Sequence, residues 1–238
     1  MSAAARPHGR VLVAGARGGI GGACVARLRA RGDAVVGVDR DTGEDITMPG
    51  GAEAAVERAV AELGGLDGVV HAVGMSGRRL GDGPVTACRD EAWAEVLRVN
   101  LESAFRLLRA TMPKLRRQGG GSVAIVGSVL AATTDDDFLT AAYAASKGAL
   151  VSLARVAARE GAADGVRVNV VASGLVRTPM AARAADDPHI QARLPDLQPL
   201  GAALLDPDDV AGAVSWLLSD EAAKVTGAVV PVDGGWLL

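Results

Sequence analysis

Short apolar runs recur along the chain, and each is followed by a glycine-rich turn and a longer, alanine-rich segment. The runs are rich in β-branched residues and are apolar at consecutive positions, so a strand built from any of them would bury both faces. They lie at residues 10–14, 34–38, 68–73, 122–126, 166–171 and 228–232. Strands of this kind need helices on both sides of a parallel sheet, which predicts a doubly wound α/β domain.

The segments between these runs carry apolar residues at helical spacing. They are residues 53–63, 93–112, 144–158 and 208–218. Pro113 is expected to end the second helix, because proline disfavours the helical conformation of the residue before it. Only residues 40–44 separate Asp39 from Asp45, too few for a helix, so we expect this edge of the sheet to be trimmed. No linker or repeat divides the chain, which predicts one domain over residues 1–238.

Charge and composition argue against several classes of protein. The net charge of −3, the pI of about 5.7 and the aromatic content of 3% disfavour nucleic-acid binding, which needs a basic surface or stacking platforms. The two cysteines and three histidines lack the spacing of a metal site, so we expect no metal. Residues 11–16 are too few for a signal peptide, and the longest uncharged segment, residues 118–134, is too short and polar for a membrane span. These features predict a soluble, cytoplasmic protein.

A glycine-rich turn follows the first predicted strand. Gly15, Gly19 and Gly21 are spaced Gly-x-x-x-Gly-x-Gly, which differs from the commoner Gly-x-Gly-x-x-Gly. Glycines between a strand and a helix let the backbone approach a pyrophosphate, and the helix N-terminus offers free N–H groups with partial positive charge. The turn predicts a dinucleotide site; a glycine-rich turn that binds no ligand is the alternative.

An acidic residue ends the second predicted strand. The Asp39 carboxylate could accept hydrogen bonds from an adenosine ribose and repel a 2′-phosphate, which favours NAD over NADP. Arg17 and Arg40 lie near it in the sequence and could hold a 2′-phosphate, so NADP stays possible. Asp45 and Ile46 could flank the adenine; the alternative for both is a simple turn.

One tyrosine and one of three lysines form the most informative pair. Tyr143, the only tyrosine of the chain, is followed four residues later by Lys147. On a helix these positions share a face, so the phenol and the ammonium would point into one site. A nearby cation stabilises the phenolate, which predicts a lowered pKa for Tyr143 and proton exchange with an alcohol or a carbonyl.

In these motifs, the chain resembles the short-chain dehydrogenase/reductase family of the Tyr-x-x-x-Lys type over essentially its whole length. The motifs occur in this order: Ala14-Gly15 to Gly19-Ile20-Gly21, Asp39, Asp45-Ile46-Thr47, His71-Ala72-Val73-Gly74, Asn100, Ser128, Tyr143-x-x-x-Lys147, Val225-Thr226-Gly227 and Val232-Asp233-Gly234-Gly235. The resemblance implies a Rossmann-like fold with a seven-stranded, mostly parallel sheet and helices on both faces, assembled as homotetramers or homodimers.

The resemblance also implies the role of individual residues. Tyr143 is expected to be the catalytic acid/base, and Ser128 to hydrogen-bond the substrate oxygen. Lys147 is expected to bind the nicotinamide ribose, and Asn100 to hold a water that links Lys147 to solvent. Cofactor contacts are expected at the following residues: Gly15, Arg17, Gly19, Ile20, Gly21, Asp39, Arg40, Asp45, Ile46, Ala72, Gly74, Tyr143, Lys147, Gly174, Val176 and Thr178.

Four departures from the family pattern bear on the site. Ala14 replaces the usual threonine, which removes a hydroxyl that ties the glycine loop to the neighbouring strand. His71 stands where the family has asparagine, and we expect it to be a structural hydrogen-bonding residue rather than a catalyst. Ser173 replaces a proline near the nicotinamide, so that loop is expected to be less stiff. Residues 135–137 are three consecutive aspartates, expected to be a solvated loop tip or, alternatively, an acidic entrance that disfavours anionic substrates. The family's substrate lid corresponds to residues 178–204.

Together these features predict an oxidoreductase that transfers a hydride between NAD(H) and a small or cyclic secondary alcohol or ketone. Two alternatives stay open: an NADPH-dependent 3-oxoacyl or polyketide-type ketoreductase, and a non-catalytic protein that senses a dinucleotide. The alanine-rich helices predicted around residues 103–112 and 149–158 are suited to close packing between subunits.

Overall fold

The apolar runs form parallel strands that are buried on both faces. The computed structural model describes residues 9–238. Its strands are β1 (Arg10–Ala14), β2 (Ala34–Val38), β3 (Gly68–His71), β4 (Gly121–Ser128), β5 (Val166–Ser173) and β6 (Val229–Val232). In β1, Leu12 and Ala14 belong to one hydrophobic cluster and Val11 and Val13 to another, so alternate side chains face opposite helical layers.

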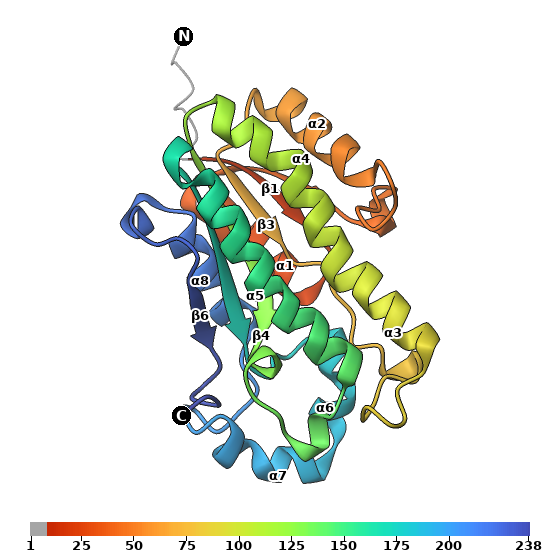
Figure 1. Ribbon diagram of the computed structural model, residues 1–238. Coiled ribbons are helices and arrows are strands. Elements are labelled where there is room, and N and C mark those ends of the chain that lie inside the picture. Colours follow the sequence, from red (N-terminus) through yellow and green to blue (C-terminus); the bar gives the residue numbers. More distant parts are fainter. Residues whose placement is uncertain (1–8) are drawn as a thin grey trace.

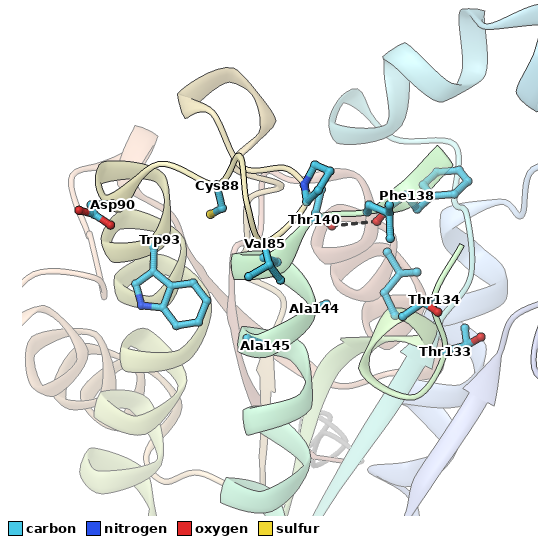
Figure 2. A pocket seen from close by; sticks show the side chains of 14 residues that line it. Val85, Cys88, Asp90, Trp93, Thr133, Thr134, Phe138, Thr140, Ala144 and Ala145 are labelled. Atoms are coloured by element: carbon cyan, nitrogen blue, oxygen red, sulfur yellow. Dashed lines mark hydrogen bonds between the residues drawn. The ribbon is translucent and has the colours of Figure 1, made fainter. Parts of the chain in front are cut away.

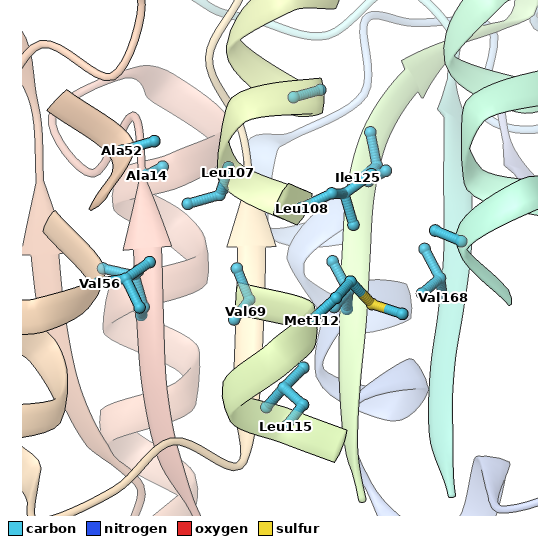
Figure 3. Packing of buried hydrophobic residues seen from close by; sticks show 14 of the residues in the cluster. Ala14, Ala52, Val56, Val69, Leu107, Leu108, Met112, Leu115, Ile125 and Val168 are labelled. Carbon is cyan, nitrogen blue, oxygen red and sulfur yellow. The ribbon is translucent and has the colours of Figure 1, made fainter. Parts of the chain in front are cut away.

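Helices cover both faces of this sheet (Figure 1). One layer contains α1 (Gly19–Arg31) and α8 (Pro207–Leu217), which pack against each other and against the cluster of Val11 and Val13. The other layer contains α2 (Gly51–Leu63), α4 (Ser103–Arg117) and α5 (Ala141–Gly161). Figure 3 shows Leu107, Leu108, Met112 and Leu115 of α4 over the strand residue Val69. No helix in the described part of the chain is long and apolar enough to cross a membrane.

The strand order β2-β1-β3-β4-β5-β6 reverses direction next to β1. The chain passes from β1 to β2 at the edge and then returns to β3 on the other side of β1, and every neighbouring pair is parallel. A reversal of this kind opens a crevice at the carboxyl ends of the two central strands, where α/β domains bind ligands. The predicted doubly wound fold is confirmed.

The number of strands differs from the expectation. Among residues 9–238 the sheet has six strands rather than seven. The missing strand lies beyond β2, where the sequence predicts a trimmed edge: Arg40–Thr42 forms only one turn of 3₁₀ helix, and α2 then leads directly back to β3. Because so short a segment cannot cross over the sheet, β2 is left as the edge strand.

The long helix predicted before Pro113 is longer and less regular than expected. It consists of α3 (Asp90–Leu97), a π-helical turn (Arg98–Glu102) and α4, and it continues past Pro113 to Arg117. The expectation that Pro113 ends the helix is therefore wrong. Pro113 lies on the exposed side of α4, where water can hydrate the carbonyl that loses its partner, while buried Leu115 holds the last turn on the sheet.

Two short helices lie beyond the carboxyl edge of the sheet, within the predicted lid of residues 178–204. They are α6 (Ala182–Asp186) and α7 (Pro188–Leu197). Ile190 and Leu197 form a small separate core with Phe138, whose ring meets that of Trp236 edge to face with centroids 5.2 Å apart. The lid thus packs on the loop that follows β4 (Figure 1).

Candidate active site

The glycine turn after β1 lies at the reversal of strand order. Gly15 has a φ of +81°, and a Cβ there would come within 2.8 Å of the carbonyl carbon and oxygen of Ala72, so only glycine fits between the loops after β1 and β3. A Cβ on Gly21 would collide with the Gly15 carbonyl, which holds the start of α1 close to β1. Ile20 packs against the core below this turn. The turn therefore presents backbone rather than side chains to the crevice.

The acidic residue after β2 is joined to this glycine turn. Asp39 accepts a hydrogen bond at Oδ2 from the Arg17 backbone N–H (3.0 Å) and forms a reciprocal pair of cap hydrogen bonds with the turn that follows it. The Arg40 side chain is 79% exposed, and its Nε lies 3.6 Å from Asp41. The carboxylate is thus fixed beside the turn, whereas the side chains of Arg17 and Arg40, the two arginines that could oppose it, are exposed.

The predicted adenine-flanking pair is only partly available to a ligand. Asp45 accepts the Thr47 backbone N–H (2.8 Å). Burial acts to raise the pKa of Asp45, but the hydrogen bonds from Thr47 outweigh it, so the pKa is lowered and the group stays ionised. Ile46 is 3% exposed and belongs to the core between β2 and α2, so little of its side chain could cover an adenine.

Ala72 and Gly74 follow β3 and face the other side of the crevice. The Ala72 N–H donates to the Ala14 carbonyl (2.9 Å), which continues the pairing of β1 and β3 beyond the strands. A Cβ on Gly74 would lie 3.4 Å from Asn100 Oδ1 and 3.5 Å from Lys147 Nζ. Gly74 therefore lies against two of the predicted catalytic residues.

The predicted cofactor residues after β5 reach back to the glycine turn. Thr178 lies over α1, because a Cβ on Gly19 would stand 2.6 Å from the Thr178 methyl group. Val176 is 4% exposed and its side chain packs in the core, so only its backbone can face the crevice. Gly174 donates its N–H to the Val232 carbonyl (3.0 Å).

A buried glutamine stiffens this segment. Gln198 is fully buried, accepts the Leu175 N–H at Oε1 (2.6 Å) and donates from Nε2 to the carbonyls of Leu175 (3.3 Å) and Ala203 (2.8 Å). The sequence predicts a less stiff loop after β5 because Ser173 replaces a proline. In the structure, Gln198 from the predicted lid holds this loop by hydrogen bonds.

Ser128, Tyr143 and Lys147 meet at the carboxyl edge of β4. Ser128 is the last residue of β4, and its Oγ accepts the Leu130 N–H (3.2 Å), which leaves the hydroxyl hydrogen free to donate. Lys147 is 4% exposed; its Nζ donates to the Val126 carbonyl (3.0 Å) and lies 5.6 Å from the centroid of the Tyr143 ring. The structure thus brings the three predicted catalytic side chains together.

The pKa of Tyr143 differs in direction from the prediction. Burial raises it, and a hydrogen bond with Ser128 only partly offsets this effect. Lys147 does not reverse it, because the ammonium lies over the ring and donates to the Val126 carbonyl. Burial also lowers the pKa of Lys147 to about 8, since a buried ammonium loses hydration.

Asn100 lies in the π-helical turn and is completely buried. Its Oδ1 accepts the Met75 N–H (2.8 Å), and its Nδ2 donates to the Met75 carbonyl (3.0 Å) and to Ser146 Oγ (3.0 Å). π-helical turns are rare within helices and frequently lie at functional sites. Asn100 therefore ties the loop after β3 to helix α5, close to Lys147.

His71 has the structural position expected of it. It is 1% exposed, and its Nε2 lies 2.8 Å from Ser103 Oγ, which itself donates to the Val99 carbonyl. Ser103 Oγ must then accept, so the proton of His71 is on Nε2. Its Nδ1 has no hydrogen-bond partner among residues 9–238. Burial and the nearby Lys147 lower its pKa to about 3, so the ring is neutral.

The three consecutive aspartates are not a free loop tip. Arg193 of α7 pairs with Asp135 (Nη2 to Oδ2, 2.6 Å) and with Asp137, and His189 Nε2 lies 3.2 Å from Asp137. The hydrogen bond from Arg193 keeps the pKa of Asp135 low. Only Asp136 is exposed, so the predicted solvated tip is wrong for its two neighbours. The charges of Asp135 and Asp137 are paired with Arg193, which joins helix α7 to this loop.

An apolar groove of about 560 Å³ runs along the outer side of α5 (Figure 2). It lies between Trp93 of α3, Val85, Phe138 and Ala144 of α5. Ala144 and Ala145 occupy a different side of α5 from Tyr143 and Lys147, which do not line the groove. The groove is therefore beside the catalytic side chains and separate from them. No group of three or more metal-ligating side chains occurs in residues 9–238.

The sequence does not predict the roles of three residues that organise the site. Asp82 accepts the backbone N–H groups of Ala142 and Tyr143, Gln198 braces the loop after β5, and Arg193 fastens the lid. Each is far in the sequence from the group it holds. The isolated aspartate and glutamine carry no motif, and only the run of three aspartates indicates that a basic partner is needed.

Comparisons with known proteins agree with this geometry. The family described as enoyl-(acyl carrier protein) reductase matches residues 14–237. The chain belongs to the short-chain dehydrogenase/reductase family, as the sequence motifs predict. The relatives of this chain include reductases of keto groups and dehydrogenases of alcohols, so its family acts on these groups.

Three relatives illustrate the similarity to known members of the family. The chain is 34% identical to the 3-oxoacyl-[acyl-carrier-protein] reductase FabG of Escherichia coli (94% of this chain, 95% of that protein). It is 33% identical to the cis-4-hydroxycyclohexanecarboxylate dehydrogenase of Sinomonas cyclohexanicum, with the same coverage. The solved structure of a short-chain type dehydrogenase/reductase from Mycobacterium ulcerans superposes with a TM-score of 0.86 at 31% identity (95% of this chain, 89% of that one).

The pKa of Tyr143 can be measured directly, because the chain has no other tyrosine. We expect spectrophotometric titration of the purified protein to give a pKa above 10, the ordinary value, since burial disfavours the phenolate. Ser128→Ala is expected to raise it further by removing the hydrogen bond. The same protein unfolded in urea supplies the reference, and a folded-state pKa at or below the unfolded one would contradict this prediction.

Proposed function

We propose that this protein transfers a hydride between NAD(H) and a small or cyclic secondary alcohol or ketone, with Tyr143 as the acid/base. The observation that carries the proposal is the meeting of Ser128, Tyr143 and Lys147 at the sheet edge where the glycine turn opens. A phenol, a hydroxyl and an ammonium around one point suit proton exchange at a single substrate oxygen.

The residues present fit a nicotinamide dinucleotide. The turn of Gly15, Gly19 and Gly21 has no room for a Cβ, which would meet Ala72, Thr178 or Gly15 itself. The turn therefore offers backbone groups to a pyrophosphate as it leads into the N-terminus of α1. Asp39 beside this turn supplies ribose acceptors, Thr178 lies over Gly19, and Gly74 lies beside Lys147. The bound cofactor would supply or accept the hydride.

The chain's own groups manage the proton. In ketone reduction, the Tyr143 phenol would donate its proton to the substrate oxygen while Ser128 hydrogen-bonds the same atom. In alcohol oxidation, the Tyr143 phenolate would take the hydroxyl proton. Because burial raises the pKa of Tyr143, the phenol is the resting form at neutral pH, and oxidation requires its deprotonation first.

Lys147 and Asn100 support this exchange. One hydrogen of the Lys147 ammonium is committed to the Val126 carbonyl, and the other two remain for ribose hydroxyls and for water near Asn100. Asn100 Oδ1 is engaged with Met75, but it lies beside Gly74 within the same small space as Lys147 Nζ. This arrangement supports the proposed link from Lys147 to solvent.

Tyr143→Phe tests the role of the phenol. We expect this variant to lose turnover by about 10²- to 10⁴-fold, the usual contribution of general acid–base catalysis, because it keeps the ring but not the proton. NADH binding, followed by calorimetry, should change little, since the glycine turn and Asp39 are untouched. Full activity of the variant would refute the proposal, and loss of NADH binding together with turnover would show a structural effect instead.

Asp39 predicts which cofactor is used. Calorimetric titration with NADH and with NADPH, at one salt concentration, should show tighter binding of NADH, because the carboxylate fixed beside the glycine turn repels a 2′-phosphate. Asp39→Ala should narrow the difference between the two cofactors. A preference for NADPH of tenfold or more would instead favour the 3-oxoacyl reductase alternative, in keeping with the name of the relative FabG.

We further propose that the protein is a homodimer or homotetramer through the layer of α3, α4 and α5. Three large apolar side chains are exposed on these helices: Trp93 (44%), Phe105 (47%) and Val156 (66%). Trp93 also lines the groove beside α5, and exposed apolar side chains of this kind are what associating subunits bury.

Light scattering of the purified protein should give a mass of two or four times 24.0 kDa. Phe105→Arg with Val156→Arg places charge in the proposed interface, and we expect it to shift the mass toward that of one chain. Trp216→Arg, on the opposite helical layer, is the matched control and should leave the mass unchanged. A wild-type monomer would contradict the proposal.

A further inference from the structure

The first turn of α5 is capped by a loop from elsewhere in the chain. The N–H of Ala141 donates to the Gly83 carbonyl (2.8 Å), that of Ala142 to Asp82 Oδ1 (3.0 Å) and that of Tyr143 to Asp82 Oδ2 (3.0 Å). Helices usually satisfy these groups with a side chain of the preceding residue. Here that residue is Thr140, whose hydroxyl donates to the Phe138 carbonyl instead (3.1 Å).

The Asp82 carboxylate is closely confined. It is 5% exposed, and each of its oxygens accepts one N–H of α5, while the Cys88 thiol donates to Oδ1 (3.5 Å). A Cβ on Gly77, whose φ is +71°, would come within 3.0 Å of the Asp82 Cβ. Hydrogen bonds to an ionised acceptor are stronger than neutral ones, and a confined acceptor transmits its position to the donors.

The carbonyl side of Tyr143 is held by the same loop. Tyr143 O accepts the Ser146 hydroxyl (2.7 Å), Ser146 Oγ accepts Asn100 Nδ2 (3.0 Å), and Asn100 binds both backbone groups of Met75. Residues 75–83 therefore hold Tyr143 at its N–H, through Asp82, and at its carbonyl, through Asn100. Among the described residues of α5, only Tyr143 has both its backbone N–H and its backbone carbonyl held by these contacts.

We propose that Asp82 is a positioning residue for Tyr143. Its bidentate contact fixes the first turn of α5 on the loop after β3, and so sets the direction in which the phenol points at the substrate oxygen. The inference rests on the proposed role of Tyr143 in proton exchange. It adds a residue that contacts neither substrate nor cofactor and acts through the backbone of the tyrosine.

Asp82→Asn tests this inference with little change of volume. An amide keeps one acceptor oxygen but turns its NH₂ group toward a backbone N–H of α5, so one of the two bonds is lost. We expect kcat to fall about 10- to 100-fold, the cost of misplacing a catalytic group by about 1 Å, with the Kd of NADH changed less than about twofold. Asp82→Ala, which removes both acceptors, should be worse.

A second measurement reads the position of the phenol without any turnover. A loosened first turn exposes Tyr143 to water, so spectrophotometric titration should show its pKa falling toward 10 in Asp82→Asn. If the wild-type protein has no activity but Asp82→Asn still lowers the pKa of Tyr143, the proposed function is refuted and the positioning role is supported. An active wild type whose variant shows neither the kcat loss nor the shift would overturn the positioning role alone.

Asp67→Asn is the matched control. Asp67 also accepts a backbone N–H, that of Arg10 (2.9 Å), but it lies just before β3 at the opposite, amino end of the sheet. It should lower thermal stability without changing kcat or the tyrosine titration. Equal losses of kcat in both variants would assign Asp82 a merely structural role, and so would failure of Asp82→Asn to fold; either result overturns the proposal.

Discussion

Parallel pairing is the constraint on which the rest of this structure depends. In a parallel sheet every strand ends at the same edge, and every connection must return over a face of the sheet as a helix. The loops after β1, β2, β3, β4 and β5 are therefore delivered to one edge. Gly15, Asp39, Gly74, Ser128 and Gly174 each follow or end one of those strands, so residues scattered over the whole chain form one site.

The local signals in the sequence predict most of this arrangement. The strands are identified by runs of consecutive apolar residues. A strand that is buried on both faces is apolar at every position and does not alternate between apolar and polar residues. The Tyr143–Lys147 pair is found because it lies within one helical turn. Two expectations about the fold are wrong for local reasons. The seventh strand is absent because residues 40–44 are too few to form it. The helix continues past Pro113 because Leu115, in the turn beyond it, is buried against the sheet.

What the sequence does not predict is which distant groups satisfy each other. Asp82, Gln198 and Arg193 hold α5, the loop after β5 and the lid across gaps of 60, 23 and 58 residues. Buried backbone N–H groups must find acceptors, but any of many polar side chains could supply them. The choice is made by the packing of loops at the sheet edge, which has no periodic signature in the chain.

The electrostatics of the buried site impose an order on its chemistry. Burial raises the pKa of Tyr143 and lowers those of Lys147, to about 8, and His71, to about 3, so each group is pushed toward its neutral form. The phenol and the imidazole are neutral at pH 7, and the ammonium of Lys147 is the charge that remains. A phenolate beside that ammonium would turn one isolated buried charge into a pair of opposite charges, and their attraction favours loss of the tyrosine proton only while Lys147 keeps its own. Burial thus favours the neutral phenol, and charge or hydrogen bonds that a filled site brings would shift the balance toward the phenolate.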